Sequence, residues 1–207
     1  LAGIRHSDAL CVDLLECPEL VQPVAQLAAE VFVEAFERLY GKMSAAGYGS
    51  TSWISMYHDG PAYIPHCDFW CLVSEEMAAQ YIWPTTQREL DPLERAIYHL
   101  DGPDALRHLP FLLNEPRIQA VQWVYGDGNG TAMRWLEVYQ RLQAHGKAMQ
   151  ILCQNTEDAL SIAEALHPQG VWMTVFHEFK DVAEAEDFVA EVGRRSGRAG
   201  KNNGDYK

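Results

Sequence analysis

Apolar residues recur every three or four positions along the segment 18–43. This spacing places them on one side of an α-helix, so it predicts an amphipathic helix over the segment. Pro18 suits the first turn, because the N–H that proline lacks would have no partner there. The repeat consists of Leu20, Val24, Leu27, Val31, Ala35 and Leu39.

The next part of the chain mixes strand and helix patterns. Segment 50–57 is β-rich, and segment 64–70 is typical of a strand or of a strand followed by a loop. Ser74, with two glutamates directly after it, predicts a helix N-terminus, because a hydroxyl cap and negative charge both suit the first amides. Pro84 lies within this helix and should kink or end it.

From residue 96 onward, strand-like and helix-like segments alternate. The strand segments are nearly all apolar, as strands buried on both faces are. The alternation predicts parallel βαβ units and an α/β fold, compatible with a doubly wound sheet or a (β/α)8 barrel. Strands are predicted at 96–100, 120–125, 149–153 and 171–176, and helices at 104–112, 131–144, 156–166 and 181–192.

Composition limits the classes of partner. The 207 residues are 48% hydrophobic and 22% charged, which is typical of a globular chain with a sizeable core. The net charge of −13 argues against nucleic acid and anionic membranes as ligands. No apolar run reaches the roughly 18 residues of a membrane span, and no signal peptide opens the chain. Five cysteines without a repeated CxxC pair indicate free thiols in a reducing compartment, so we expect a cytoplasmic protein.

Both ends of the sequence are unusual. The chain opens with LAGIRHSD, without methionine, which suggests a fragment or a processed chain. It closes with a polar, glycine-rich and mostly basic stretch whose last three residues match the start of an epitope tag. We therefore expect one domain over 1–193 and a disordered tail over 194–207.

Polar side chains collect where the predicted strands end. In the stretch AIYHLDGP, His99 and Asp101 are two positions apart, so both point to the same side of the strand. The carboxyl ends of parallel strands are where α/β barrels form their active sites. His99 and Asp101 could also be a buried pair that caps the strand before the Gly102-Pro103 turn. The other strand ends carry Gln122 and Trp123, then Cys153 to Asn155, and finally His177 and Glu178.

Four segments carry a resemblance to a known family. They are CDFWCLVSEEMAAQYIWPTTQREL (67–90), YHLDGPDALRHL (98–109), IQAVQWVYGDG (118–128) and WLEVYQRLQAHGK (135–147). Together they resemble the uroporphyrinogen decarboxylase superfamily, closest to a decarboxylase-like branch related to the corrinoid-linked methyltransferases. The resemblance covers nearly all of residues 8–192. It implies a (β/α)8 barrel of the TIM type, of which this chain holds the C-terminal part. A second chain or a missing N-terminal segment would complete that barrel.

The resemblance also implies a metal site. The methyltransferase branch binds zinc through an H-x-C-G motif and a third ligand at the end of the final strand. This chain reads His99-Leu100-Asp101-Gly102 at the motif, and His177 stands near the third position. We therefore expect zinc or another divalent transition metal at His99, Asp101 and His177. Aspartate in place of cysteine makes a harder site, better suited to iron, manganese or an oxygen nucleophile.

Further residues are expected at this site. Asp68, at a strand end where the family has a substrate-facing carboxylate, is predicted to be catalytic together with Asp101 and Gln122. Trp123 would floor a substrate or cofactor pocket, or simply pack in the core. Trp70 and Asn155 are also predicted to bind substrate or cofactor. A second cluster consists of His66, Cys67, Asp68 and Cys71, which could bind a metal or simply contain small buried cysteines in a packed strand and loop.

The function expected from the resemblance is methyl transfer from a methylcorrinoid-type donor, held by a corrinoid protein, to a small-molecule acceptor that the metal activates. One alternative is a metal-free decarboxylase of tetrapyrrole metabolism, in which Asp68 or Asp101 stabilises a protonated pyrrole-like intermediate. The last predicted strand ends TVFHEF and lacks the late Gly-His-Gly of true decarboxylases, which weakens that alternative. A third reading is a partial barrel that serves as a non-catalytic binding or assembly subunit.

Overall fold

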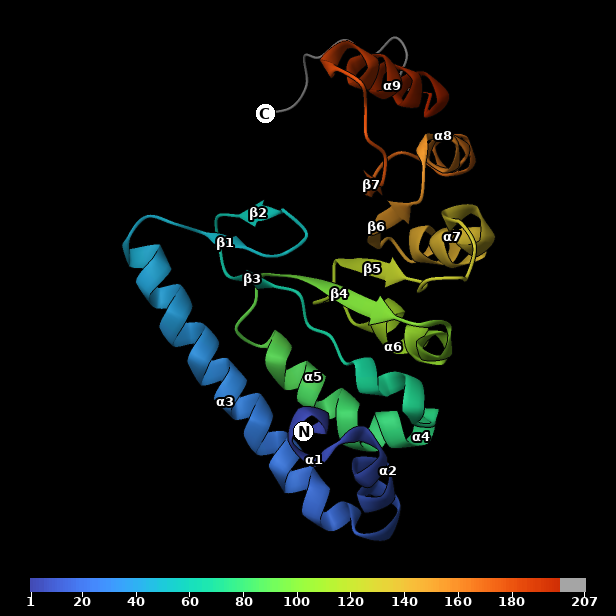
Figure 1. Cartoon of the computed structure of the whole chain (residues 1–207). Coiled ribbons are helices and arrows are strands. Elements are labelled where there is room, and N and C mark those ends of the chain that lie inside the picture. The colour runs from blue at the N-terminus through green and yellow to red at the C-terminus, as the bar shows by residue number, and fades with distance from the viewer. Residues whose placement is uncertain (198–207) are drawn as a thin grey trace. The chain divides into compact units, whose positions relative to one another are not determined.

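The computed structural model describes residues 1–197, which form two compact units, Leu1–Gly126 and the part of the chain from Asp127 onward. Each unit combines helices with parallel strands, so the predicted α/β class is confirmed (Figure 1). Most of the tail predicted over 194–207 lies outside the described residues, although the last helix runs through Arg195. Among the residues described, no helix is both long enough and apolar enough to cross a bilayer.

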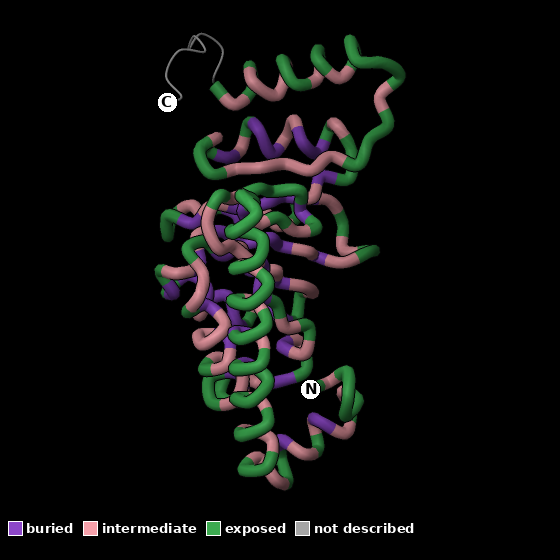
Figure 2. The backbone as a smooth tube through the Cα atoms, turned by 90° about the vertical axis from the view of Figure 1, so that its left-hand side faces the viewer, coloured by how far each residue is buried: buried purple, intermediate pink, exposed green. Residues whose placement is uncertain are grey.

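The first unit opens with three helices. These are α1 (Ala2–Arg5), α2 (Ser7–Glu16) and α3 (Pro18–Ala45). The helix predicted over 18–43 is thereby confirmed, and Pro18 occupies its first turn. Its buried residues are Ala29 and Val33, whereas the apolar repeat that includes Leu27 and Val31 is exposed. Figure 2, in which α3 faces the viewer, shows how much of this helix is exposed.

The segments predicted as strands at 50–57 and 64–70 are shorter than expected. Segment 50–57 is not one strand: β1 (Ser50–Thr51) and β2 (Tyr57–His58) pair antiparallel across a turn. Ser55 lies in this turn with a φ of 54°, in the left-handed region, which interrupts an extended backbone. Strand β3 (Ala62–Tyr63) comes next, followed by an extended segment and the 3-10 helix η1 (Asp68–Leu72).

A helical segment follows from Ser74 to Leu90. It consists of α4 (Glu75–Met77), the π-helical turn η2 (Ala78–Ile82) and α5 (Trp83–Leu90). The Oγ of Ser74 accepts a hydrogen bond from the N–H of Met77 at 3.2 Å, so the predicted cap is confirmed. The helix does not end at Pro84. Instead, the π-helical turn just before it accommodates the missing N–H and the bulk of the ring.

Two longer strands complete the sheet of the first unit. β4 (Arg95–Asp101) runs parallel to both β3 and β5 (Ala120–Val124). The connection from β4 to β5 is made by η3 (Pro103–His108) and α6 (Leu109–Asn114). Alternate residues of β4 are fully buried, namely Ala96, Tyr98 and Leu100. The residues between them are only partly buried, and these include His99 and Asp101.

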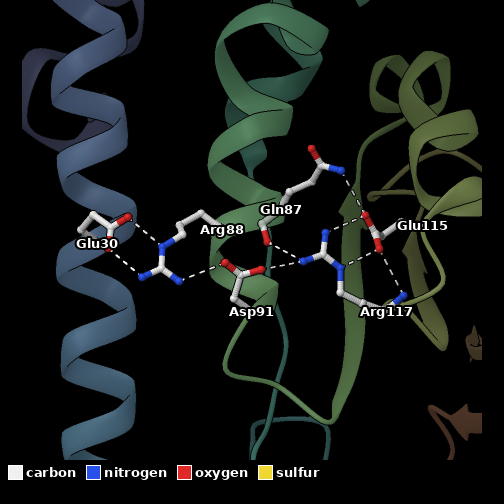
Figure 3. Close-up of polar contacts among 6 residues, drawn as sticks. All are labelled: Glu30, Gln87, Arg88, Asp91, Glu115 and Arg117. Carbon is white, nitrogen blue, oxygen red and sulfur yellow. Dashed lines mark hydrogen bonds and ion pairs between the residues drawn. The ribbon is translucent and has the colours of Figure 1, made fainter.

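A chain of ion pairs ties α3 to α5 and to the segment before β5 (Figure 3). Arg88 donates to both carboxylate oxygens of Glu30, at 2.7 and 2.8 Å, and to Asp91 at 3.0 Å. Arg117 in turn donates to Asp91 at 2.7 Å and to the buried carboxylate of Glu115 at 2.8 and 2.9 Å. Opposite charges therefore alternate along these five side chains, so each of them has at least one partner of opposite charge.

The second unit repeats the strand–helix order. Its elements are η4 (Ala132–Trp135), α7 (Leu136–Ala144), β6 (Ala148–Cys153), α8 (Thr156–Ala165), β7 (Val171–Val175) and α9 (Val182–Arg195). Strands β6 and β7 are parallel. The side chain of Asp181 caps the last helix, because it accepts from the N–H of Glu184 at 3.0 Å. The carboxylate of Glu184 bonds the N–H of Lys180, not that of Asp181.

Candidate metal centre

Three side chains of the first unit converge at the end of β4. Asp68, His99 and Asp101 each offer one ligand atom, and these three atoms lie within 4.8 Å of one another. His99 and Asp101 come from the partly buried face of β4, as their spacing predicts. Asp68 is the first residue of η1 and is exposed. The group is therefore accessible from solvent.

The pairing of the chain before η1 explains why Asp68 arrives there. The N–H of His99 donates to the carbonyl of Pro65 at 3.0 Å, and His66 forms a parallel bridge with His99. This register continues the pairing of β3 with β4 beyond the short strand itself. Asp68 follows His66 by two residues, as Asp101 follows His99, so the two carboxylates reach the same place.

The imidazole of His99 is held by a neighbour on the next strand. Gln122 lies directly opposite His99 in the register of β4 and β5, and its Oε1 is 2.5 Å from Nδ1 of the ring. An amide oxygen only accepts hydrogen bonds, so Nδ1 carries the proton and Nε2 of the neutral ring keeps its lone pair. Gln122, predicted to be catalytic, is thus positioned to orient His99.

Aromatic rings surround His99 on the exposed side. The rings of Trp53, His66 and His99 meet edge to face, with centroids 5.8 to 6.0 Å apart. Trp53 remains 55% exposed, so it shields the imidazole without closing the approach to it. These contacts restrict rotation of the His99 ring in addition to its hydrogen bond with Gln122.

The turn after the group depends on glycine. Gly102 has a φ of 83°, in the left-handed region that only glycine adopts without strain. Its N–H donates to the carbonyl of Val124 at 2.9 Å, which fixes the end of β4 against β5. Asp101 is the residue before this turn, so the turn sets where its carboxylate points.

One imidazole nitrogen and two carboxylate oxygens form a plausible ligand set for a divalent cation. Zinc accepts both kinds of atom, and iron and manganese accept them as well. Two carboxylates balance the charge of a divalent ion when the imidazole is neutral. Three protein ligands leave further coordination positions open, as in catalytic rather than structural sites.

The composition of this group differs in one member from the expected one. Asp68, predicted as a catalytic carboxylate, lies within ligand distance of His99 and Asp101. His177, the predicted third ligand, belongs to the second unit, where it follows β7, is exposed and packs against Phe179 at 4.7 Å. A contribution of His177 to this centre stays a prediction. In the sequence, the feature that points to Asp68 as a ligand is its spacing of two residues from His66. That spacing becomes informative only once the pairing of His66 with His99 is known.

The predicted binding residues have packing or capping contacts in the structure. Trp70 is fully buried and stacks on Tyr98 at 5.2 Å. Trp123 is fully buried on the face of β5 opposite to Gln122. Asn155 caps α8, accepting from the N–H of Asp158 at 2.9 Å. Contact of these three side chains with a substrate stays a prediction.

The cysteines considered as ligands remain thiols. Burial raises the pKa of Cys67 to about 12 and that of Cys153 to about 12, so neither is a thiolate at neutral pH. The thiol of Cys71 donates to the backbone oxygen of Asp68 at 3.0 Å. That bond helps to fix the backbone of η1 beside the metal group. Among residues 1–197, the group of converging ligands contains no sulfur.

Comparisons with known proteins do not identify a relative. No family model, curated protein or solved structure matches the chain. The resemblance to the uroporphyrinogen decarboxylase superfamily therefore stays a prediction, and the function has to be inferred from the convergence of Asp68, His99 and Asp101.

Proposed function

We propose that the first unit binds one divalent transition metal through Asp68, His99 and Asp101 and that the protein is a metal-dependent enzyme. The observation that carries this proposal is the convergence of the three ligand atoms within 4.8 Å at a solvent-accessible strand end. The hydrogen bond from Nδ1 of His99 to Gln122 supports it, because histidines that bind metals usually donate their other N–H to a fixed acceptor.

The residues of the centre have different roles in this proposal. When bound, the metal supplies Lewis-acid activation of an acceptor group, which lowers the pKa of that group. The two carboxylates neutralise the added charge, and Gln122 holds the His99 ring in the tautomer whose Nε2 is free to bind the metal. Trp53 covers part of the imidazole and reduces its contact with water.

The reaction class that we propose is methyl transfer to a small-molecule acceptor, with a methylcorrinoid-type donor held by a separate corrinoid protein. This class comes from the resemblance of residues 8–192 to the decarboxylase and methyltransferase superfamily. In the same proposal, the strand–helix alternation from β4 to α9 is part of a (β/α)8 barrel that another chain or segment completes. All five cysteines are free, which supports a reducing, cytoplasmic location.

One observation favours a second candidate. Asp68 and Asp101 bring two carboxylates to one place, which would also suit a metal-free decarboxylase that stabilises a positively charged pyrrole-like intermediate. The two candidates make opposite predictions about the metal, so a single set of binding measurements separates them.

The deciding experiment is a titration of metal-stripped protein with Zn²⁺, Mn²⁺ and Fe²⁺, followed by calorimetry and elemental analysis. We expect one ion per chain, and a loss of affinity on the order of 100-fold in His99→Ala, Asp68→Asn and Asp101→Asn. Asp104→Asn is the matched control, because this aspartate lies close in sequence but its side chain is 79% exposed. Unchanged affinity in the three variants would refute the proposal, and decarboxylation of a porphyrinogen by metal-free protein would favour the second candidate.

A further inference from the structure

The first unit contains a cavity of about 340 Å³ that lies beside the metal centre. It is lined by the N-terminal helices, by the segment around Cys67 and by the helical segment from η2 to α5, and it is open to solvent on one side. This volume is at the lower end of the range of small-molecule sites, roughly 300–1,000 Å³. Its apolar wall is formed by Leu10, Leu14, Val21, Ala25, Phe69 and Ile82.

The polar part of the cavity carries acidic side chains. Glu89 lines it together with Thr85 and Thr86, and the lining residues include no arginine or lysine. Burial raises the pKa of Glu89 to about 7, and no cation offsets that shift. Within residues 1–197, Glu89 forms no ion pair or hydrogen bond. The carboxyl group of Glu89 thus lies beside apolar side chains and borders the open volume of the cavity, without a cationic side chain as a partner.

We propose that this cavity binds a small organic cation, an amine with a compact apolar group, whose ammonium pairs with the carboxylate of Glu89. The apolar group would pack against the wall that Leu14, Val21 and Ile82 contribute. An incoming ammonium supplies a cationic partner for Glu89, and the ion pair is strengthened by its charge-assisted hydrogen bonds and by the partial burial of the carboxyl group. An anion is excluded by Glu89, by Asp68 at the same cavity and by the net charge of −13.

Binding of the amine is separate from binding of the metal, although Asp68 borders both sites. Glu89 lies on α5, whereas His99 and Asp101 lie on β4. A variant that removes the metal, His99→Ala, should therefore bind the amine as the original chain does. This variant distinguishes failure of the cavity proposal from failure of the metal proposal.

The test uses two probes of nearly equal shape, cyclohexylmethylamine and cyclohexylmethanol, titrated into the full chain in the presence of a chelator. We expect the amine to bind at least about tenfold more tightly than the alcohol. Glu89→Gln should remove this preference while leaving the weak binding of the alcohol unchanged. Glu37→Gln, an exposed glutamate of α3, is the matched control and should keep the preference.

A second variant guards against an indirect effect of Glu89. Ala25→Leu adds volume to the apolar wall and should weaken both probes, with the protein still folded by circular dichroism. Equal binding of amine and alcohol, retention of the preference in Glu89→Gln, or no binding of either probe to the original chain would each overturn the proposal.

Discussion

At the scale of single residues, the ring of His99 depends on one amide. Gln122 accepts from Nδ1, and this bond selects the tautomer in which Nε2 keeps the lone pair that a metal would need. Gln122→Leu removes the acceptor, so we expect metal affinity to fall by about 10- to 100-fold. Calorimetric titration with Zn²⁺ checks this.

Gln122→Glu serves as the comparison for that variant. The carboxylate still accepts from Nδ1 of His99, so metal affinity should stay close to that of the original chain. Equal affinities in the leucine and glutamate variants would show that Gln122 does not orient the ring.

Glu115 gives a pH-dependent prediction. Hydrogen bonds from Arg117 lower the pKa of this buried carboxyl from its usual value to about 2. A depressed pKa means that the ionised group stabilises the fold above about pH 4.5, and that this contribution is lost as the pH falls toward 2. Glu115→Gln should therefore lower the free energy of unfolding by about 2 kcal/mol at pH 7.

Urea unfolding of both proteins between pH 7 and pH 3 provides the measurement. The difference between Glu115→Gln and the original chain should stay constant from pH 7 to about pH 4.5 and shrink below that pH. Glu186→Gln, at an exposed position of α9, should show no such difference at any pH. A constant difference for Glu115→Gln would mean that its charge is not what stabilises the fold.

At the scale of the elements, the residues of α3 that predict a helix are not the residues that it buries. Its apolar repeat correctly predicts the helix, yet the residues buried in the structure are Ala29 and Val33. Val33→Ala should lower the free energy of unfolding by about 1–2 kcal/mol, because it leaves a gap in packed surroundings. Leu27→Ala, at a position that is 62% exposed, should change it by about 0.5 kcal/mol or less. A larger loss in Leu27→Ala than in Val33→Ala would contradict the packing of this helix.

Some helices and strands could be predicted from the sequence, and others could not. The alternation after residue 95 was predictable because buried parallel strands are almost entirely apolar and helix caps such as Asp181 are local signals. Segment 50–57 was not, because a β-rich composition does not show where a turn divides it. His99 and Asp101 share a face for local reasons, whereas the arrival of Asp68 depends on strand pairing between distant segments.

At the scale of the whole molecule, charge should influence the metal centre. The net charge of −13 attracts a divalent cation over distances comparable to the screening length, which is about 30 Å at 0.01 M salt and 10 Å at 0.1 M. Metal affinity should therefore fall by about three- to tenfold between these two salt concentrations. Titration with Zn²⁺ at both concentrations, using a non-coordinating salt, checks this.

His99→Ala is the control for the salt effect, because any residual binding in this variant reports cations attracted to the surface in general. If affinity in the original chain does not depend on salt, the field of the whole molecule plays no part in binding.

The left-handed turn at Gly102 has a consequence for finding relatives of this chain. Any other residue there would strain the backbone and shift the carboxylate just before it, so descendants that keep the centre are constrained to His-x-Asp-Gly. A glutamine 23 positions after the histidine and an aspartate 31 positions before it complete the signature. A search for this pattern could find relatives whose sequences are too divergent to align. Among them, loss of the glycine would indicate that the centre is no longer maintained.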